Sequence, residues 1–191
     1  MGCAAHKQVR LEGSQIHIHL DQKQIDLIRM SWEIVSDNLQ NNGMMIFMRL
    51  FQLDRDLLRV FKSILTTNKI YDESDVDEEK LSQHSLIVMQ SLGAAVESLE
   101  DSLFLTNVLI AIGEKHAQHH VKEHMLPRMW PAVRFAFKEI LQDCYTDEIE
   151  KAWKIVFEFL ISKIGEGIRQ AVKKQHDAKK TTKESTSAIN S

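Results

Sequence analysis

The sequence predicts an all-α domain, and three observations support this fold class. The 191 residues include only 7 glycines and 2 prolines, too few of the turn-forming residues that β-sandwiches and barrels need. Apolar residues make up 43% of the chain, which is enough for a sizeable core. Apolar side chains also recur at the spacing of amphipathic helices in six or seven segments. Because these segments differ in length and their links are short, we expect a crossed-helix globule rather than a regular bundle.

The first predicted helix begins at Asp21, because Asp21 and Gln24 match a capping box and apolar residues at helical spacing follow them. A second helix is expected to begin after Gly43. A short helical turn through 57–61 completes the N-terminal part of the domain.

An acidic run predicts the start of the next helix. Residues 72–79 hold six acids in eight positions, and negative charge is favoured at a helix N-terminus by the helix dipole. This helix is expected to run to about Leu99. The following helix is expected to begin near Asp101 or Ser102 and to end near His119.

Two prolines obscure the start of the penultimate helix, which runs to about Asp143. A proline in the first turn costs little, but Pro127 and Pro131 are four residues apart, so one of them would remove an internal hydrogen bond. The last helix is expected to begin at Asp147 and to end at the basic pair 173–174, as the helix dipole prefers.

The predicted organisation has three parts. An N-terminal extension covers 1–20, one domain covers 21–175, and a disordered polar tail covers 176–191, which is almost free of large apolar residues.

Charge and cysteine content exclude several classes of protein. Lys and Arg number 24 against 27 Asp and Glu, so the net charge of −3 gives no basic face for nucleic acid. Cys3 and Cys144 are too few and too far apart for a disulfide framework, which indicates a reducing compartment. No signal peptide or bilayer-spanning apolar run is present. We therefore expect a cytoplasmic protein, held at a membrane only by something attached to it.

Two histidines are the candidate functional residues. His84 lies on the apolar face of one predicted helix, and His116 lies on the apolar face of the next. A single histidine in such a place is more often a core residue than a ligand. Two of them, facing each other, would be costly to bury without a shared partner. An iron porphyrin is such a partner, since it needs a flat apolar slot and an imidazole nitrogen on the iron axis.

The stretches GMMIFMRLFQLDRDLLRVF, KLSQHSLIVM and IAIGEKHAQHHV resemble the globin family, in particular its neuroglobin and globin X groups. The resemblance spans 21–175 and implies a globin fold of six to eight crossed helices around a pocket for haem b. It also implies that His116 is the proximal ligand of the haem iron and that His84 is the distal one. Phe61 would then stack on the haem, and Phe47 would lie over the distal pocket.

The same resemblance assigns the wall of the pocket. Val88, one turn after the distal histidine, would limit ligand access, and Val121 would form part of the proximal wall. Relatives often carry a basic residue, paired with a haem propionate, where this chain has Ile87. The propionate contact must then come from elsewhere, and His120 and the neighbouring Lys122 are the candidates.

Zinc is the alternative occupant. The run HAQHHVKEH contains i,i+4 histidine pairs, His116 with His120 and His120 with His124, which could bind zinc. Periodicity alone does not choose His116 over His119 or His120. The spacing of the resembling family favours His116 and haem.

The implied function is reversible binding of dioxygen, carbon monoxide and nitric oxide, with both histidines on the iron when no ligand is bound. The alternative is a membrane-associated haemoprotein that takes part in redox, nitric oxide or nitrite chemistry, or in oxidative-stress signalling. A reductase would be its protein partner. A third interpretation, a helical interaction module without haem, is disfavoured because both histidines and Phe61 are present. No catalytic motif indicates an enzyme, so nitrite reductase or nitric oxide dioxygenase activity would be a side reaction.

The N-terminus predicts a lipid anchor. Gly2 is the acceptor position for N-myristoylation and Cys3 beside it is a site for palmitoylation, although His6 stands where the motif prefers Ser or Thr. Two acyl chains would hold the protein stably at the inner face of the plasma membrane, because one chain alone binds only marginally. Lys7 and Arg10 would add attraction to an anionic leaflet.

Overall fold

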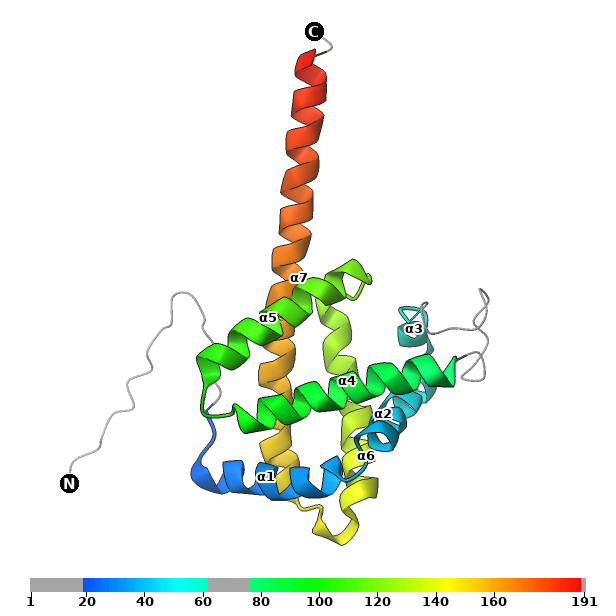
Figure 1. Cartoon of the computed structure of the whole chain (residues 1–191), viewed down its shortest axis with the longest axis vertical. Coiled ribbons are helices and arrows are strands. Elements are labelled where there is room, and N and C mark those ends of the chain that lie inside the picture. The colour runs from blue at the N-terminus through cyan, green and yellow to red at the C-terminus, as the bar shows by residue number, and fades with distance from the viewer. Residues whose placement is uncertain (1–18, 62–75, 190–191) are drawn as a thin grey trace, which may run out of the picture.

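The computed structural model describes residues 19–61 and 76–189, and for residue 102 and residues 180–189 it describes the backbone only. The described chain is all-α, which confirms the predicted fold class (Figure 1). Its elements are α1 (Gln22–Ser36), α2 (Leu39–Leu53), α3 (Arg55–Leu58), α4 (Glu78–Glu97), α5 (Ser102–Gln118), the 3-10 helix η3 (Glu123–Met129), α6 (Trp130–Leu141), the 3-10 turn η4 (Gln142–Cys144) and α7 (Asp147–Ile189).

Aspartate side chains cap three helices where the sequence predicts a start. Asp21 accepts a hydrogen bond from the backbone N–H of Gln24 at 2.8 Å, and the Gln24 side chain accepts one from the Asp21 N–H, which completes the capping box. Asp77 and Asp101 each accept a hydrogen bond from the backbone N–H three residues ahead. The predicted starts of α1, α4 and α5 are therefore confirmed.

The predicted start of α2 is wrong. The helix begins at Leu39, because the Asn38 side chain accepts a hydrogen bond from the backbone N–H of Asn41 and caps it there. Gly43 lies inside the helix, where α2 meets α4: a Cβ at this position would lie 2.9 Å from the carbonyl oxygen of Ser85. Gly43 thus allows two helices to approach closely rather than forming a turn.

The two prolines occupy consecutive elements. Pro127 lies inside the 3-10 helix η3, and Pro131 lies in the first turn of α6, where the absence of its N–H costs little.

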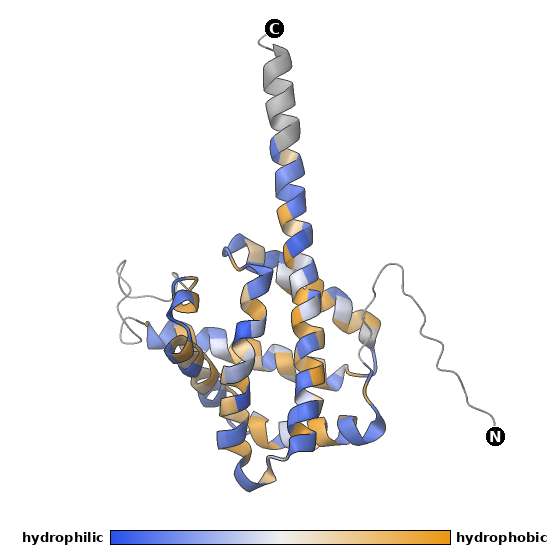
Figure 2. Ribbon diagram, turned by 180° about the vertical axis from the view of Figure 1, so that it is seen from behind, coloured by the Kyte–Doolittle hydropathy of each residue, from blue (hydrophilic) through white to orange (hydrophobic). Residues whose placement is uncertain are grey.

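The last helix extends further than the sequence predicts. α7 continues past 173–174 to Ile189, so residues 176–189 are helical instead of the expected disordered tail. No glycine or proline follows Gly167, so no residue breaks the helix. Figure 1 shows this part of α7 projecting beyond the other helices, and Figure 2 shows that the hydrophobic residues of α7 concentrate where it passes through the globular body. Among the described residues, no helix is both long enough and apolar enough to cross a membrane.

One main hydrophobic core joins α1, α2, α4, α6 and α7, and a smaller cluster joins α4, α5 and α7. A buried hydrogen bond crosses the main core: Trp153 Nε1 on α7 donates to Ser31 Oγ on α1 at 2.8 Å. Ser31 in turn donates to the carbonyl of Leu27 at 2.7 Å. Both polar groups of this contact are therefore satisfied in the dry interior.

We expect Ser31→Ala to lower the free energy of unfolding by about 1–3 kcal/mol, because the buried indole N–H of Trp153 loses its acceptor. Urea unfolding measures this change. Ser91→Ala is the matched control, since Ser91 is exposed and its hydroxyl bonds only to a carbonyl of its own helix. Equal stability of the two variants would contradict the assigned role.

Candidate functional site

His84 on α4 lies within a group of aromatic rings. Its ring centroid is 5.1 Å from that of Phe47 and 5.6 Å from that of Phe61, both edge-on. Phe47 and Phe61 also contact each other, with centroids 5.6 Å apart. The structure thus brings together three of the predicted site residues, from α2, from the chain after α3, and from α4. Phe51, which the sequence analysis did not assign to the site, completes the group at 5.2 Å from Phe61.

The surroundings of His84 disfavour its charged form. Burial lowers its pKa below the ordinary value of 6.5, and the positive charges that His116 and His119 carry when protonated lower it further. A neutral imidazole is the form that coordinates a metal.

This pKa shift predicts a pH dependence in the metal-free chain. Because His84 binds a proton less readily when folded than when unfolded, its contribution to the free energy of unfolding is present above pH 6.5 and is lost as the pH falls below 6.5. Urea unfolding of wild type and His84→Gln at pH 7.5 and 5.5 isolates this contribution. We expect a smaller loss in the variant, and equal losses would contradict the shift.

His116 on α5 is oriented by its own helix. Its Nδ1 lies 2.8 Å from the carbonyl oxygen of Ile112, one turn earlier. A carbonyl oxygen only accepts, so Nδ1 carries the proton and Nε2 keeps its lone pair free for a metal. This is the arrangement by which proteins fix the tautomer and the ring orientation of a histidine ligand.

The helices that carry the two histidines are held by different partners. The turn at 98–101 joins α4 to α5, and the two helices then pack on different partners. Helix α4 packs on α2 and α1, whereas α5 packs on α7 (Figure 1). Gly113 on α5 and Gly167 on α7 make the second contact unusually close. A Cβ on Gly113 would lie 2.0 Å from the carbonyl oxygen of Ile164, and a Cβ on Gly167 would lie 2.0 Å from that of Ile110. The crossing lies one turn before His116 and fixes its position.

The other predicted residues lie further from this group. Val88 is half-buried against the main core, one turn after His84. His120 is exposed and follows the end of α5. Val121 lines a groove beside α7. The contacts of the described chain do not place His120 or Val121 beside the aromatic group of His84.

His120 ends α5 in a left-handed conformation, with φ of 64°. The N–H of His120 donates to the carbonyl of Ala117 at 3.1 Å, and the N–H of Val121 donates to that of His116 at 3.3 Å. These two bonds form a Schellman motif, in which His120 takes the place that glycine usually occupies.

We expect His120→Gly to raise the free energy of unfolding of the metal-free protein by about 1 kcal/mol, because glycine adopts positive φ without steric cost. Thermal unfolding measures the change, and His119→Gly provides a control in which φ is −95° and no gain is expected. A loss of stability in His120→Gly would mean that the imidazole makes a stabilising contact. The same variant tests the propionate assignment, since haem would then dissociate faster.

The donor set fits a haem better than a zinc ion. Within the described ranges, no group of three or more His, Cys, Asp or Glu side chains is arranged to hold a metal ion. The histidine pairs of 116–124 therefore do not form a zinc site of the usual composition. A histidine among aromatic rings on α4 and a histidine oriented by its own helix on α5 match the ligands that haem proteins use instead.

An all-α chain with one histidine among aromatic rings and a second histidine whose Nε2 is left free is typical of a haem-binding class of protein. The family model described as Globin matches residues 44–164. The chain belongs to the globin family.

Relatives and solved structures agree with this assignment. The chain is 28% identical to neuroglobin of Chaenocephalus aceratus and to neuroglobin of Danio rerio, in each case over 78% of this chain and 92% of the relative. Among solved structures, it is similar to a hexacoordinated heme protein from an anhydrobiotic tardigrade, with a TM-score of 0.68 and 25% identity over 80% of this chain and 97% of the other.

Proposed function

We propose that this globin binds haem b between His116 and His84 and reversibly binds dioxygen, carbon monoxide and nitric oxide at the iron. The observation that carries the proposal is the pair of prepared imidazoles. His116 is held with Nε2 free by its bond to Ile112, and His84 is kept neutral among Phe47 and Phe61. The similarity to a solved heme protein described as hexacoordinated supports two histidine ligands.

Haem, when bound, would supply the iron at which a diatomic ligand binds. His116 would hold the haem through Nε2, and α5 holds His116 in place because it packs closely on α7 at Gly113. His84 would hold the haem as well and would compete with the diatomic ligand. The rings of Phe47 and Phe61 exclude water from the side of His84 and restrict how far His84 can turn away.

The competition lowers the apparent affinity. A ligand binds only the fraction of molecules in which His84 has left its position, so the apparent dissociation constant rises by the inverse of that fraction. Removal of His84 is therefore expected to tighten ligand binding and to accelerate it.

Absorption spectra of the haem-reconstituted chain in ferric, ferrous and carbonyl forms test the proposal. We expect an intense Soret band that shifts on addition of carbon monoxide. A chain that takes up no haem, or takes it up without responding to carbon monoxide, would overturn it. Metal analysis of the purified protein gives iron and no zinc if the proposal holds.

The lipid anchor stays a prediction, because Gly2 and Cys3 lie outside the described residues. We propose that acylation at these positions places the globin at a membrane, where it serves redox or nitrogen-oxide chemistry with a reductase. Cell fractionation of wild type, Gly2→Ala and Cys3→Ser tests this, and a wild-type protein wholly in the soluble fraction would end the idea.

A further inference from the structure

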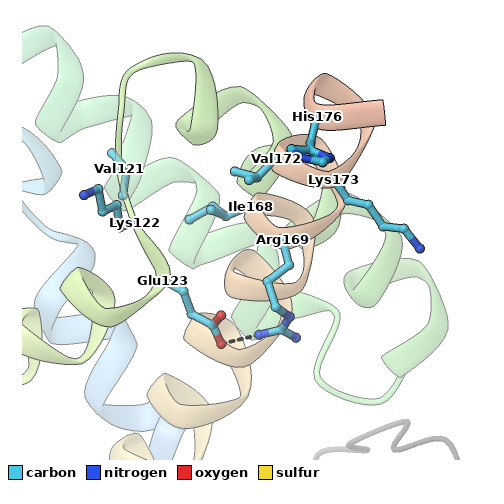
Figure 3. A pocket seen from close by; sticks show the side chains of 8 residues that line it. All are labelled: Val121, Lys122, Glu123, Ile168, Arg169, Val172, Lys173 and His176. Atoms are coloured by element: carbon cyan, nitrogen blue, oxygen red, sulfur yellow. Dashed lines mark hydrogen bonds and ion pairs between the residues drawn. The ribbon is translucent and has the colours of Figure 1, made fainter. Parts of the chain in front are cut away.

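A concave site lies beside α7, outside the aromatic group of His84. It has a volume of about 460 Å³ and lies between α7 and the chain that connects α5 to η3. Figure 3 shows Ile168 and Val172 projecting from α7 towards the connecting chain at Val121. We call this site the α7 groove and define its apolar floor as Val121, Ile168 and Val172.

The floor has an exposed apolar side chain at its open end. Val172 is 54% exposed, whereas Ile168 is 3% exposed and anchors the floor to the globular body. Water therefore wets an aliphatic surface that continues directly into the core. Covering such a surface with another apolar chain is favourable in proportion to the area removed from water.

Positively charged side chains stand at the edges of the floor. Lys122 and Lys173 line the groove at opposite edges in Figure 3. Neither lysine has an ion-pair partner among the described side chains. The one acidic side chain in the lining, Glu123, is already neutralised by an ion pair with Arg169, which closes the lower end of the groove.

We propose that the α7 groove binds a single-chain amphipathic anion, a long-chain carboxylate or a lipid of the same chemistry, with the acyl chain on the apolar floor and the anionic head at the edge that carries Lys173. The volume lies in the range of small-molecule sites. The apolar floor distinguishes such a ligand from a nucleic acid, which would need a polar, phosphate-binding surface. The concave corner between two segments of backbone suits one molecule rather than a flat membrane.

The groove lies outside the aromatic group of His84. None of the residues that line it belongs to the aromatic group of His84, and α7 carries the groove on the part that leaves the globular body (Figure 1). The backbone N–H of Val121 bonds to the carbonyl of His116 and so connects the groove to the end of α5. Filling the groove therefore does not require haem to be absent.

Isothermal titration calorimetry with dodecanoate below its micelle concentration tests the proposal on the full-length, haem-reconstituted protein. We expect one bound dodecanoate per chain, with dodecanol at least about fivefold weaker and dodecyltrimethylammonium weaker still, because the head group faces exposed cations. Equal binding of the three amphiphiles, or no binding of dodecanoate, would overturn the proposal.

Two variants locate the site without touching the histidines. Lys173→Glu and Val172→Asp are each expected to weaken dodecanoate at least about fivefold, since both positions are exposed and both changes oppose the ligand. Lys151→Glu on α7 and Leu103→Asp on α5 are the matched controls at exposed positions elsewhere. If the controls weaken binding as much as the groove variants, the proposal fails.

A last arm distinguishes the sources of the ligand. Sedimentation with phosphatidylserine vesicles tests the lipid surface, and the calorimetric titration tests the free molecule. Binding of monomeric dodecanoate that is lost in Lys173→Glu supports the proposal whether or not vesicles also bind. Binding to vesicles alone would overturn it in favour of a surface contact. Haem uptake is recorded for every variant, so that failure of the groove and failure of the haem assignment give different results.

Discussion

His116→Ala is expected to be purified almost free of haem, whereas His84→Ala retains it. His116 is the histidine whose ring is oriented from its own helix, with Nδ1 bonded to Ile112 and Nε2 available, so in the proposed site its removal would delete the permanent bond to iron. The proposal places His84 on the exchangeable side, so its removal would leave the proximal bond intact. The haem-to-protein ratio, measured by the pyridine haemochrome assay, checks the difference.

The two histidine variants serve as controls for each other. Both histidines are half-buried, so a general loss of packing would affect the two variants alike. Circular dichroism of both verifies that the helices persist. Equal loss of haem from the two variants would contradict the assignment of His116 as the proximal ligand.

The second large effect is expected at the crossing of α5 and α7. Gly113→Ala would place a Cβ 2.0 Å from the backbone carbonyl of Ile164, and Gly167→Ala would place one 2.0 Å from that of Ile110. Helix backbone cannot move aside as a flexible side chain does, so the two helices must separate. We expect each variant to lose about 3 kcal/mol or more of its free energy of unfolding. Gly113→Ala should also weaken haem retention, because α5 carries His116.

Gly165→Ala is the matched control on the same helix. A Cβ there would meet the side chain of Glu123, with the nearest atom at 3.0 Å, and an exposed glutamate can turn away. Alanine also favours the helix over glycine by about 1 kcal/mol. We therefore expect no loss, or a small gain, by urea unfolding. A Gly167→Ala variant as stable as Gly165→Ala would show that the helices do not cross at the distance described.

The sequence could predict much of the fold because local chemistry determines most helix ends. Capping aspartates mark α1, α4 and α5, and the structure uses each of them. The start of α2 was placed too late because Gly43 resembles a turn residue, whereas Asn38 caps the helix and Gly43 serves the contact with α4, which the pattern of α2 alone does not reveal. The end of α7 was misjudged because a polar composition indicates exposure, whereas a helix needs a residue that breaks it in order to stop.

The candidate site also contains residues that the sequence predicts and features that it does not predict. Phe47, Phe61 and His84 are found together because each stands on an apolar face or in a recognisable stretch of sequence. Phe51 was missed, although its position one turn after Phe47 on the same helix was the available signal. The Schellman motif at His120 and the α7 groove could not be predicted, because the first depends on a backbone angle and the second on two segments far apart in the chain.

The central claim is that His84 and His116 share one iron, and the spectrum of the ferrous, ligand-free protein tests it most directly. Wild type is expected to show the narrow, split bands of low-spin, six-coordinate haem. His84→Ala is expected to show the broad band of high-spin, five-coordinate haem and to bind carbon monoxide faster. A wild-type spectrum that is already high-spin and five-coordinate would contradict the claim.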